Sequence, residues 1–250
     1  MSSSEVFVWG KIKMEKGQSR IDLNLNNDIF SKNQTCPLPL LAIQNSTSPA
    51  ISVFAGYFQS TILIDNGSCY EWRKDKKNGI DSKKILIPHD ICNVQHGTTH
   101  SIALGLGNLW GWGSSINGKL GQCSTKTKIT RPIPISIGRT NLKCVSIGCG
   151  DDYSITVMEN GTVFLLGKHP EMQVTKSKGI SSVQKIRPLK ISMPIQIHKV
   201  ACGPKHTILL SCDRGQIFSW GCGQYGRLGK DFFKCMFHNF YTFLITLRLF

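Results

Sequence analysis

The sequence has few acidic residues and lacks the patterns that would mark an enzyme or a metal site. Asp and Glu number 15 against 30 Lys and Arg, so carboxylates for acid–base chemistry are scarce. The ten cysteines include no C-x2-C pair, which argues against a zinc site. A G-x4-G-K-[ST] phosphate loop is also absent. We therefore expect no catalytic chemistry of the chain's own, no cofactor and no metal, and no residue can be named as catalytic.

The sequence also lacks a signal-peptide pattern and a long uninterrupted apolar run. The first residues, MSSSEVFVWG, have no basic segment followed by an apolar core. The apolar stretch in residues 231–250 is short and is interrupted by Lys234, His238, Asn239 and Arg248. A membrane segment is therefore the weakest interpretation of it. We expect a reducing compartment, the nucleus or the cytoplasm, and no membrane partner.

The excess of basic residues gives a formal net charge of +15, which favours anionic partners such as nucleic acid, chromatin or acidic protein surfaces. The basic residues lie mainly between apolar runs and show none of the basic–aromatic alternation of a single-strand binding groove. Solvated loops are the plainer interpretation, and contact with chromatin or nucleic acid through these loops is the alternative. The basic runs are residues 73–77, 83–84, 126–131 and 176–190.

Glycine is abundant, with 24 residues spread along the chain, and it punctuates a repeated unit. The clearest copy is VACGPKHTILLSCDRGQIFSWGCGQYGRLG at residues 200–229, in which three apolar runs are separated by turn residues. Aligned glycines in four copies, Gly56, Gly97, Gly150 and Gly203, are 41, 53 and 53 residues apart. A unit of about 50 residues in fixed order predicts a repeat array, most simply a β-propeller.

Two copies end in the same pattern, W-G-x4-G-x-L-G, at residues 112–121 and 220–229. With the Cys-Gly-x-x-His of residues 202–206, this tail resembles the repeats of the regulator of chromosome condensation family. The resemblance covers about residues 5–230 and implies an all-β fold, a β-propeller of four-stranded blades. A ring of seven such blades needs about 350 residues, so four copies predict a partial or open ring.

The predicted domain of repeats spans residues 1–230, and residues 231–250 form a hydrophobic tail outside the pattern. We expect the fourth strand of a blade to come from Pro-flanked runs such as residues 133–137 or 191–197. The tail has three interpretations: non-native sequence, which we favour, a strand or helix that caps the open edge, or a membrane segment. The copies lie near residues 51–84, 91–135, 142–190 and 197–230, preceded by an N-terminal strand at residues 5–10.

The polar and aromatic residues of the motif have structural roles in this interpretation. The histidines should bond neighbouring backbone at the start of a buried strand, and the tryptophans should fill the core between blades. Cysteines beside the repeat glycines are expected to be packed thiols. Asp151-Asp152 reads as a loop tip and not as an acid–base pair. The residues concerned are His100, His206, Trp112, Trp220, Cys149 and Cys202.

Three functions fit the resemblance. The first is a scaffold whose blade loops bind a protein partner, with regulation of a small GTPase included. The second is guanine-nucleotide exchange on a Ran-type GTPase with chromatin association, which displaces phosphate and magnesium contacts without covalent chemistry. The third is the propeller part of a larger kinase or ubiquitin ligase. The exchange residues of the family lie outside the repeat motif, so none transfers to this sequence.

Overall fold

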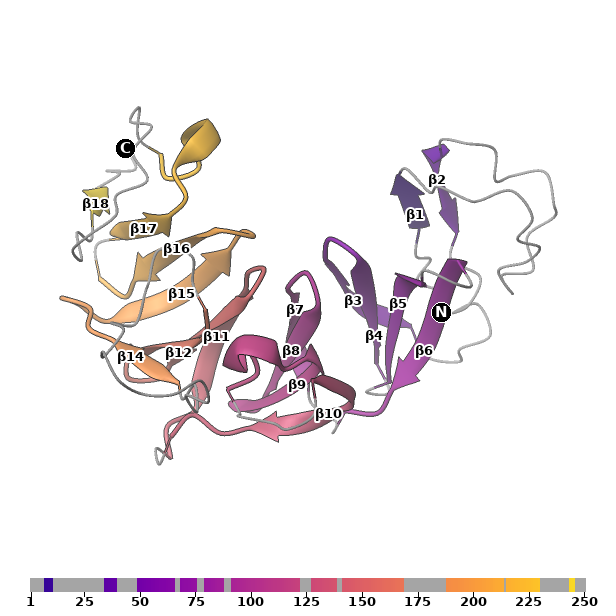
Figure 1. Ribbon diagram of the computed structural model, residues 1–250, viewed down its shortest axis with the longest axis horizontal. Helices are drawn as coiled ribbons and strands as arrows, with labels where there is room; N and C mark the ends of the chain where they lie inside the picture. Colours follow the sequence, from indigo (N-terminus) through magenta and orange to yellow (C-terminus); the bar gives the residue numbers. More distant parts are fainter. Residues whose placement is uncertain are drawn as a thin grey trace. The chain divides into compact units, whose positions relative to one another are not determined.

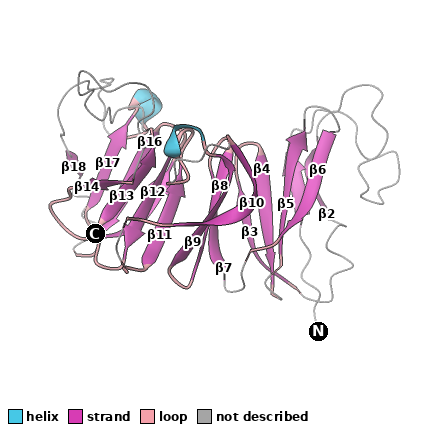
Figure 2. Ribbon diagram, turned by 60° about the horizontal axis from the view of Figure 1, so that its bottom comes forward, coloured by secondary structure: helices cyan, strands magenta, loops and turns pink. Residues whose placement is uncertain are grey.

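The computed structural model divides the chain into two compact units, residues 1–89 and 90–250, and each is described by itself. Both units are built of β-strands, with short 3-10 turns in the second (Figure 2). The structure describes residues 7–10, 34–39, 49–65, 68–75, 79–87, 91–121, 127–138, 141–168, 188–213, 215–229 and 243–245.

The first unit contains one repeat and one smaller sheet. The repeat is a four-stranded antiparallel sheet in the order β3-β4-β5-β6. The strands are β3 (Ala50–Ala55), β4 (Gln59–Ile64), β5 (Cys69–Asp75) and β6 (Gly79–Ile85). The smaller sheet pairs β1 (Phe7–Gly10) with β2 (Gln34–Pro39), so the described partner of the N-terminal strand comes from the same unit.

The second unit contains three more four-stranded sheets in chain order (Figure 1). The second repeat comprises β7 (Ile91–His96), β8 (His100–Gly105), β9 (Asn108–Ser114) and β10 (Lys128–Ile135). The third comprises β11 (Cys144–Cys149), β12 (Tyr153–Met158), β13 (Val163–Gly167) and β14 (Leu189–Ile191). The fourth comprises β15 (Ile197–Cys202), β16 (His206–Ser211), β17 (Ile217–Gly221) and β18 (Phe243–Ile245).

Four sheets of four antiparallel strands confirm the predicted fold class. Successive residues of a strand point to opposite faces of its sheet, so a sheet can contact one neighbour on each face. Within the second unit, adjacent sheets pack face to face in this way. One core joins the second repeat to the third, and includes Ile102, Ile147 and Leu166. The next core joins the third repeat to the fourth, and includes Ile155, Leu165 and Leu209.

The fourth strands only partly match their predicted sources. In the second repeat, Pro132 and Pro134 lie in β10, at the sheet's edge, where a missing N–H is tolerated. In the third repeat the prediction of a strand over residues 191–197 is wrong: β14 ends at Ile191, and β15 of the next sheet begins at Ile197. In the fourth repeat, three residues of the hydrophobic tail pair with β17 as strand β18.

Backbone hydrogen bonds join successive repeats of the second unit at the turn between the second and third strands. Cys144 N donates to Gly107 O at 2.9 Å, and Ile197 N donates to Gly161 O at 3.2 Å. Both glycines have positive φ, 81° and 77°. A Cβ on Gly107 would lie 2.6 Å from Lys143 Cβ, so the turn needs glycine for conformation and for space.

Candidate functional site

The loop between the first and second strands has the same backbone hydrogen bond in all four repeats. The glycine N–H donates to the carbonyl three residues later, at 2.8 Å from Gly56 to Gln59 and at 2.9 Å from Gly150 to Tyr153. Gly97 and Gly203 repeat this bond, each at 2.9 Å. A loop held in this way presents its two middle residues on a fixed frame, which suits a binding loop.

The glycine is required by the aromatic ring that follows it. A Cβ on Gly150 would lie 2.0 Å from Tyr153 Cε1, and one on Gly203 would lie 2.0 Å from His206 Cε1. The ring at the start of the second strand therefore lies directly over the glycine. This contact explains why the motif pairs glycine with histidine or tyrosine three residues later.

These rings connect each repeat to the next. His100 Nε2 lies 2.7 Å from Ser154 Oγ of the third repeat, and both residues are fully buried. Tyr153 OH takes the same place one repeat later, and it donates to His206 O at 2.7 Å and accepts from Thr207 Oγ1 at 3.0 Å. The prediction was a bond from the His100 ring to neighbouring backbone; the structure places this ring against a hydroxyl of the next repeat. We call each ring–hydroxyl pair a junction lock.

The middle residues of the loops add a polar network across the same junctions. Lys119 Nζ donates to Asp152 Oδ1 at 2.7 Å and to Thr99 Oγ1 at 2.9 Å, although the Lys119 side chain is only 3% exposed. The Thr98 hydroxyl donates to the Asp151 carboxylate, and Asp151 N donates to Pro204 O at 2.9 Å. Asp151 and Asp152 are therefore used in junctions, which agrees with the predicted loop tip.

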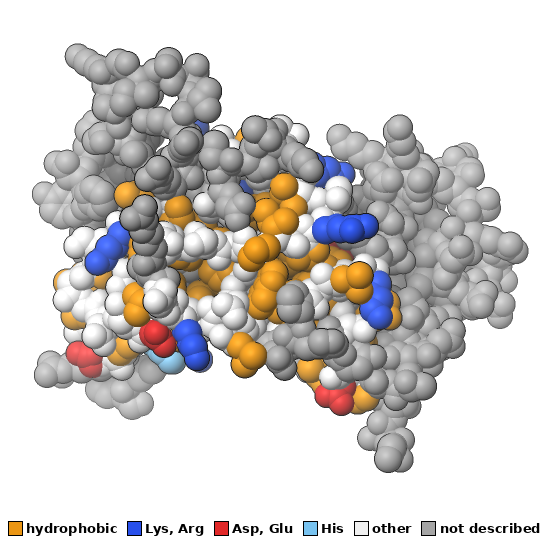
Figure 3. Space-filling view, turned by 90° about the horizontal axis from the view of Figure 1, so that it is seen from below, with side chains coloured by type: hydrophobic (Ala, Val, Ile, Leu, Met, Phe, Trp, Pro, Cys, Tyr) orange, Lys and Arg blue, Asp and Glu red, His pale blue; other side chains and the backbone are white. Residues whose placement is uncertain are grey.

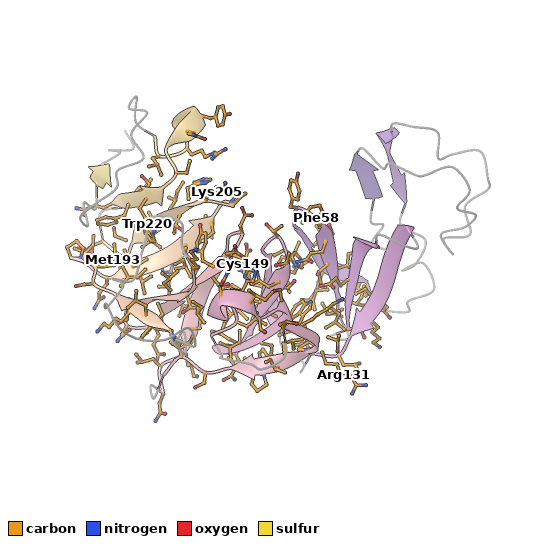
Figure 4. The ribbon with its side chains drawn as sticks, viewed as in Figure 1. Phe58, Arg131, Cys149, Met193, Lys205 and Trp220 are labelled. Atoms are coloured by element: carbon orange, nitrogen blue, oxygen red, sulfur yellow. The ribbon has the colours of Figure 1, made fainter. Side chains whose placement is uncertain are left out.

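Burial shifts the titration of the ring and thiol groups at the junctions. Burial, together with the nearby Lys119 charge, lowers the pKa of His100 to about 3, so its ring is neutral at physiological pH. Burial raises the pKa of the Cys149 thiol to about 12, and the thiol of Cys202 is raised to about 12 for the same reason. Thiols that stay protonated are poor nucleophiles, so Cys149 and Cys202 act as packed side chains; Figure 4 shows Cys149 among neighbouring side chains.

The tryptophans of the motif pack as predicted. Trp112 is buried, and Trp220 packs against the core between the third and fourth repeats. Each is followed by a glycine with large positive φ, 97° at Gly113 and 111° at Gly221. A Cβ on Gly221 would lie 2.4 Å from Lys205 O, so this glycine lets the loop backbone come close.

The first repeat differs from the others in its loop. Its two middle residues are Tyr57 and Phe58, which are 79% and 49% exposed and stack edge to face with ring centroids 4.5 Å apart. The corresponding residues of the other loops are Thr98-Thr99, Asp151-Asp152 and Pro204-Lys205. Sequence reasoning missed this aromatic pair, although aligning the copies on their glycines would have shown two aromatics where the other copies have none.

The fourth repeat exposes a second aromatic. Tyr225, in the turn η3 (Gln224–Gly226), is 84% exposed and has φ of 59°, unusual for tyrosine. The Arg227 guanidinium lies 5.1 Å from its ring centroid. Asn117 occupies the same place in the turn η2 (Ile116–Gly118) of the second repeat, with φ of 64°.

The prediction that the basic runs form loops is wrong for three of them: residues 73–75 lie in β5, residues 83–84 in β6 and residues 128–131 in β10. Most of the fourth run, residues 176–190, lies outside the described residues. On the face shown in Figure 3, the described Lys and Arg side chains are separated by hydrophobic and uncharged surface. Among the described residues, no group of three or more His, Cys, Asp or Glu could hold a metal ion. The same described part contains no helix with the length and apolar character to span a membrane.

Two segments match the family model of the Regulator of chromosome condensation (RCC1) repeat, residues 107–157 and 197–227. The chain carries RCC1-type repeats. The first match runs from the third strand of the second repeat into the third repeat. The type of repeat predicted from the tail motif is therefore confirmed.

The chain spans between about a fifth and two fifths of the length of three curated relatives that it matches. Probable E3 ubiquitin-protein ligase HERC3 of Homo sapiens is 26% identical over 216 residues, which cover 80% of this chain and 20% of HERC3. Protein RCC2 of Homo sapiens is 33% identical over 126 residues, 50% of this chain and 23% of RCC2. Regulator of chromosome condensation of Homo sapiens is 26% identical over 160 residues, 62% of this chain and 37% of that protein.

Solved structures show the same fold. Yeast RCC1 (Prp20), solved with Kap60, superposes with a TM-score of 0.71 at 18% identity, over 92% of this chain and 55% of that chain. Prp20p from Saccharomyces cerevisiae, solved in a study of its binding to Gsp1p and histones, gives 0.68 at 18% identity, over 90% and 56%. Human WBSCR16 gives 0.67 at 20% identity, over 92% and 59%. At these identities the likeness establishes the RCC1-type propeller fold.

Proposed function

We propose that this chain is a protein-interaction module and that the loop of its first repeat is a contact surface for a protein partner. The observation that carries the proposal is the exposed, stacked pair of Tyr57 and Phe58. Exposed aromatic side chains are frequent energetic centres of protein interfaces, because they bury large areas at small entropic cost.

The other loops support this assignment by contrast. The middle residues of the second and third repeats are engaged at the junction between these two repeats, through the Thr98–Asp151 bond and the Lys119–Asp152 ion pair. Phe58 has no polar side-chain atom for such a contact, and the Tyr57 side chain is 79% exposed. A rigid glycine turn that presents two aromatics is a feature of recognition more than of packing.

The partner we favour is a small GTPase, with guanine-nucleotide exchange as the activity. Prp20p, which has the same fold, is described with its binding to Gsp1p and histones, and this supports a search among GTPases. Exchange needs a rigid surface that displaces nucleotide contacts and needs no covalent catalyst.

The test is nucleotide release from a panel of small GTPases loaded with a fluorescent guanine nucleotide, in parallel with direct binding. We expect the chain to bind one member, and Tyr57→Ala with Phe58→Ala to weaken binding at least tenfold. Leu86→Ala is the matched control, since Leu86 is exposed in the same unit. Acceleration of release would establish exchange, binding without acceleration would leave a scaffold, and binding unaffected by the double substitution would refute the loop as contact.

A chromatin contact is a second candidate, favoured by the net charge of +15. It would place the protein in the nucleus, whereas a scaffold alone fits nucleus or cytoplasm. If basic loops bind DNA phosphates, affinity for duplex DNA or nucleosomes should fall steeply between about 50 and 200 mM salt. A salt slope near zero would exclude this contact.

A role within a ubiquitin ligase is a third candidate, favoured by the match of HERC3 to 80% of this chain. In that role the repeats would recruit a substrate or regulator. Isolation of the endogenous protein with an antibody to the repeats, followed by mass measurement, tests it. A ligase domain on the same polypeptide is the expected result, and a polypeptide without one would exclude it.

A further inference from the structure

The turn between β8 and β9 in the second repeat holds a leucine in a conformation that leucine seldom adopts. Gly105 of β8 pairs with Asn108 of β9, which leaves a turn of two residues. These residues, Leu106 and Gly107, both have positive φ, 49° and 81°. Such a turn favours asparagine followed by glycine, because a branched apolar side chain is strained at positive φ. Leucine at this place therefore lowers the stability of the turn.

Burial does not offset this strain. The Leu106 side chain is 70% exposed, so it gains little from packing within the chain. In the other three repeats the residue before the turn glycine is polar: Asn66, Asn160 and Arg214. A side chain that is apolar, strained and exposed at the same time is better explained by a contact outside the chain than by folding.

The third repeat holds this turn in place. Cys144 N donates to Gly107 O at 2.9 Å, and a Cβ on Gly107 would lie 2.6 Å from Lys143 Cβ. The second repeat has a described repeat before it and another after it in the chain, so the exposure of Leu106 does not rest on a repeat at either end of the array. Leu106 is therefore a fixed projection, which reduces the entropy lost on binding.

Two exposed residues of the third repeat lie beside the turn. Val145 follows Cys144 and is 45% exposed. Lys143 is exposed, and within the described part of the chain its ammonium forms no ion pair. We call Leu106, Lys143 and Val145 the turn patch. An apolar surface with one cation at its side is complementary to an apolar pocket bordered by a carboxylate.

A neighbouring acidic residue favours a protein over a lipid surface as the occupant. Glu159, in the corresponding turn of the third repeat, is exposed, and its carboxylate accepts a hydrogen bond from Lys143 N at 3.2 Å. Anionic lipids attract basic segments and would be repelled by this carboxylate. A protein pocket can accommodate the mixed charges one by one.

We propose that the turn patch binds a protein partner, with Leu106 in an apolar pocket of that partner and the Lys143 ammonium beside a carboxylate at the rim of the pocket. The turn lies at the end of β8, and the glycine loop lies at its start, about 20 Å away for a strand of six residues. The turn patch is therefore distinct from the loops, and this inference does not depend on the proposed loop contact or its GTPase.

The first measurement compares stability with binding in one variant. Leu106→Asn should raise the midpoint of urea unfolding, by up to about 0.5 M, because asparagine relieves the strain at positive φ. The same variant should lose the partner. A gain in stability together with a loss of binding separates a binding residue from a structural one, and a lowered midpoint would overturn the proposal.

The second measurement identifies the partner and its affinity. A photo-crosslinking amino acid at position 106 of the full chain, with position 160 as the matched control, should join one protein from position 106 alone. That protein is then purified and its affinity measured. Leu106→Asn should weaken binding about tenfold, as expected for a buried leucine side chain. Lys143→Glu should weaken it more at low salt than at high salt.

Leu86→Asn removes an exposed leucine outside the turn patch and should bind like wild type. No protein joined from position 106, or a purified protein whose affinity is unchanged in Leu106→Asn, would overturn the proposal. Vesicles of phosphatidylserine and phosphatidylcholine are the remaining arm. Leu106-dependent binding to these vesicles, without a protein joined from position 106, would replace the protein partner with a lipid surface.

Discussion

The third and fourth repeats show that burial in this array depends on neighbours more than on a repeat's own sequence. The fourth repeat has the complete motif, with Cys202-Gly203, His206 and the Trp220-Gly221 tail. The third has Tyr153 in place of the histidine and Leu166-Gly167 in place of Trp-Gly. Yet β12 of the third repeat is buried on both faces and β16 of the fourth is not. In a repeat array, stability comes from the interface terms as well as from each unit.

The largest expected effect compares the two rings of these repeats. Tyr153→Ala should lower the free energy of unfolding by about 3–5 kcal/mol, because it empties a buried site and removes the bonds to Thr207 and His206. His206→Ala should cost less than about 1 kcal/mol, since its ring is only partly buried. Urea unfolding followed by fluorescence and circular dichroism measures both. Equal losses of unfolding free energy would contradict the conclusion that burial by a neighbouring repeat makes Tyr153 contribute more than His206.

The pH dependence of stability should distinguish the fully buried His100 from the partly buried His206. The pKa of His100 is lowered to about 3, so the unfolded chain binds a proton near pH 6.5 that the folded chain does not bind until about pH 3. Stability should therefore fall as pH decreases below about 6.5, by about 1.4 kcal/mol per pH unit for this group. The pKa of His96 is lowered to about 4 by burial, so a second contribution has the same sign.

The measurement is the urea midpoint between pH 7 and pH 4.5 for wild type and two variants. His100→Gln should reduce the slope of stability against pH. His206→Gln should change this slope less, because burial is the main cause of its lowered pKa and this ring is only partly buried. An unchanged slope in His100→Gln would contradict the lowered pKa, because the ring would then bind its proton at the same pH in the folded and unfolded chain.

Replacing the repeat glycine by alanine should destabilise the chain more in the third repeat than in the fourth. Gly150→Ala places a methyl group against a Tyr153 ring that the fourth repeat covers, so we expect a loss of about 2–4 kcal/mol. Gly203→Ala meets the His206 ring, which can turn toward solvent, and should cost about 1 kcal/mol. Gly215→Ala is the control for backbone strain alone, since its Cβ would meet nothing within 4 Å. Thermal unfolding ranks the three variants, and the reverse order would refute the interpretation.

The smallest effect concerns the turns η2 and η3. Tyr225→Asn should stabilise the chain by about 0.5–1 kcal/mol, because asparagine adopts positive φ more readily than tyrosine. Asn117→Tyr should lose a similar amount in the second repeat. A melting-temperature difference of a few degrees in opposite directions is the expected result, and no difference would show that Tyr225 is not strained.

The sequence predicts the parts of the fold that depend on neighbours along the chain. Glycine turns, alternating strands and the packing of Trp112 follow from local pattern, and the structure confirms them. The locks were missed because they join residues about 54 positions apart. A signal was present, since Ser60, Ser101, Ser154 and Thr207 place a hydroxyl at the same position in every copy. Buried Lys119 had a weaker signal, because the fourth repeat alone also has a basic residue, Arg227, at this place.

Each junction between repeats has a loop end, with a ring and a hydroxyl, and a turn end, with the backbone bond at Gly107 or Gly161. These two ends should differ in which substitutions they tolerate. At the loop end, a change in Tyr153 must be matched by a change in the residue it bonds, so substitutions there are coupled in pairs. At the turn end, Cys144 N and Ile197 N bond to carbonyl oxygens that every residue possesses. Only the glycine is required, and the residues around it are free to diverge. In related arrays, residues at the loop end of each junction should therefore covary, and residues at the turn end should vary independently.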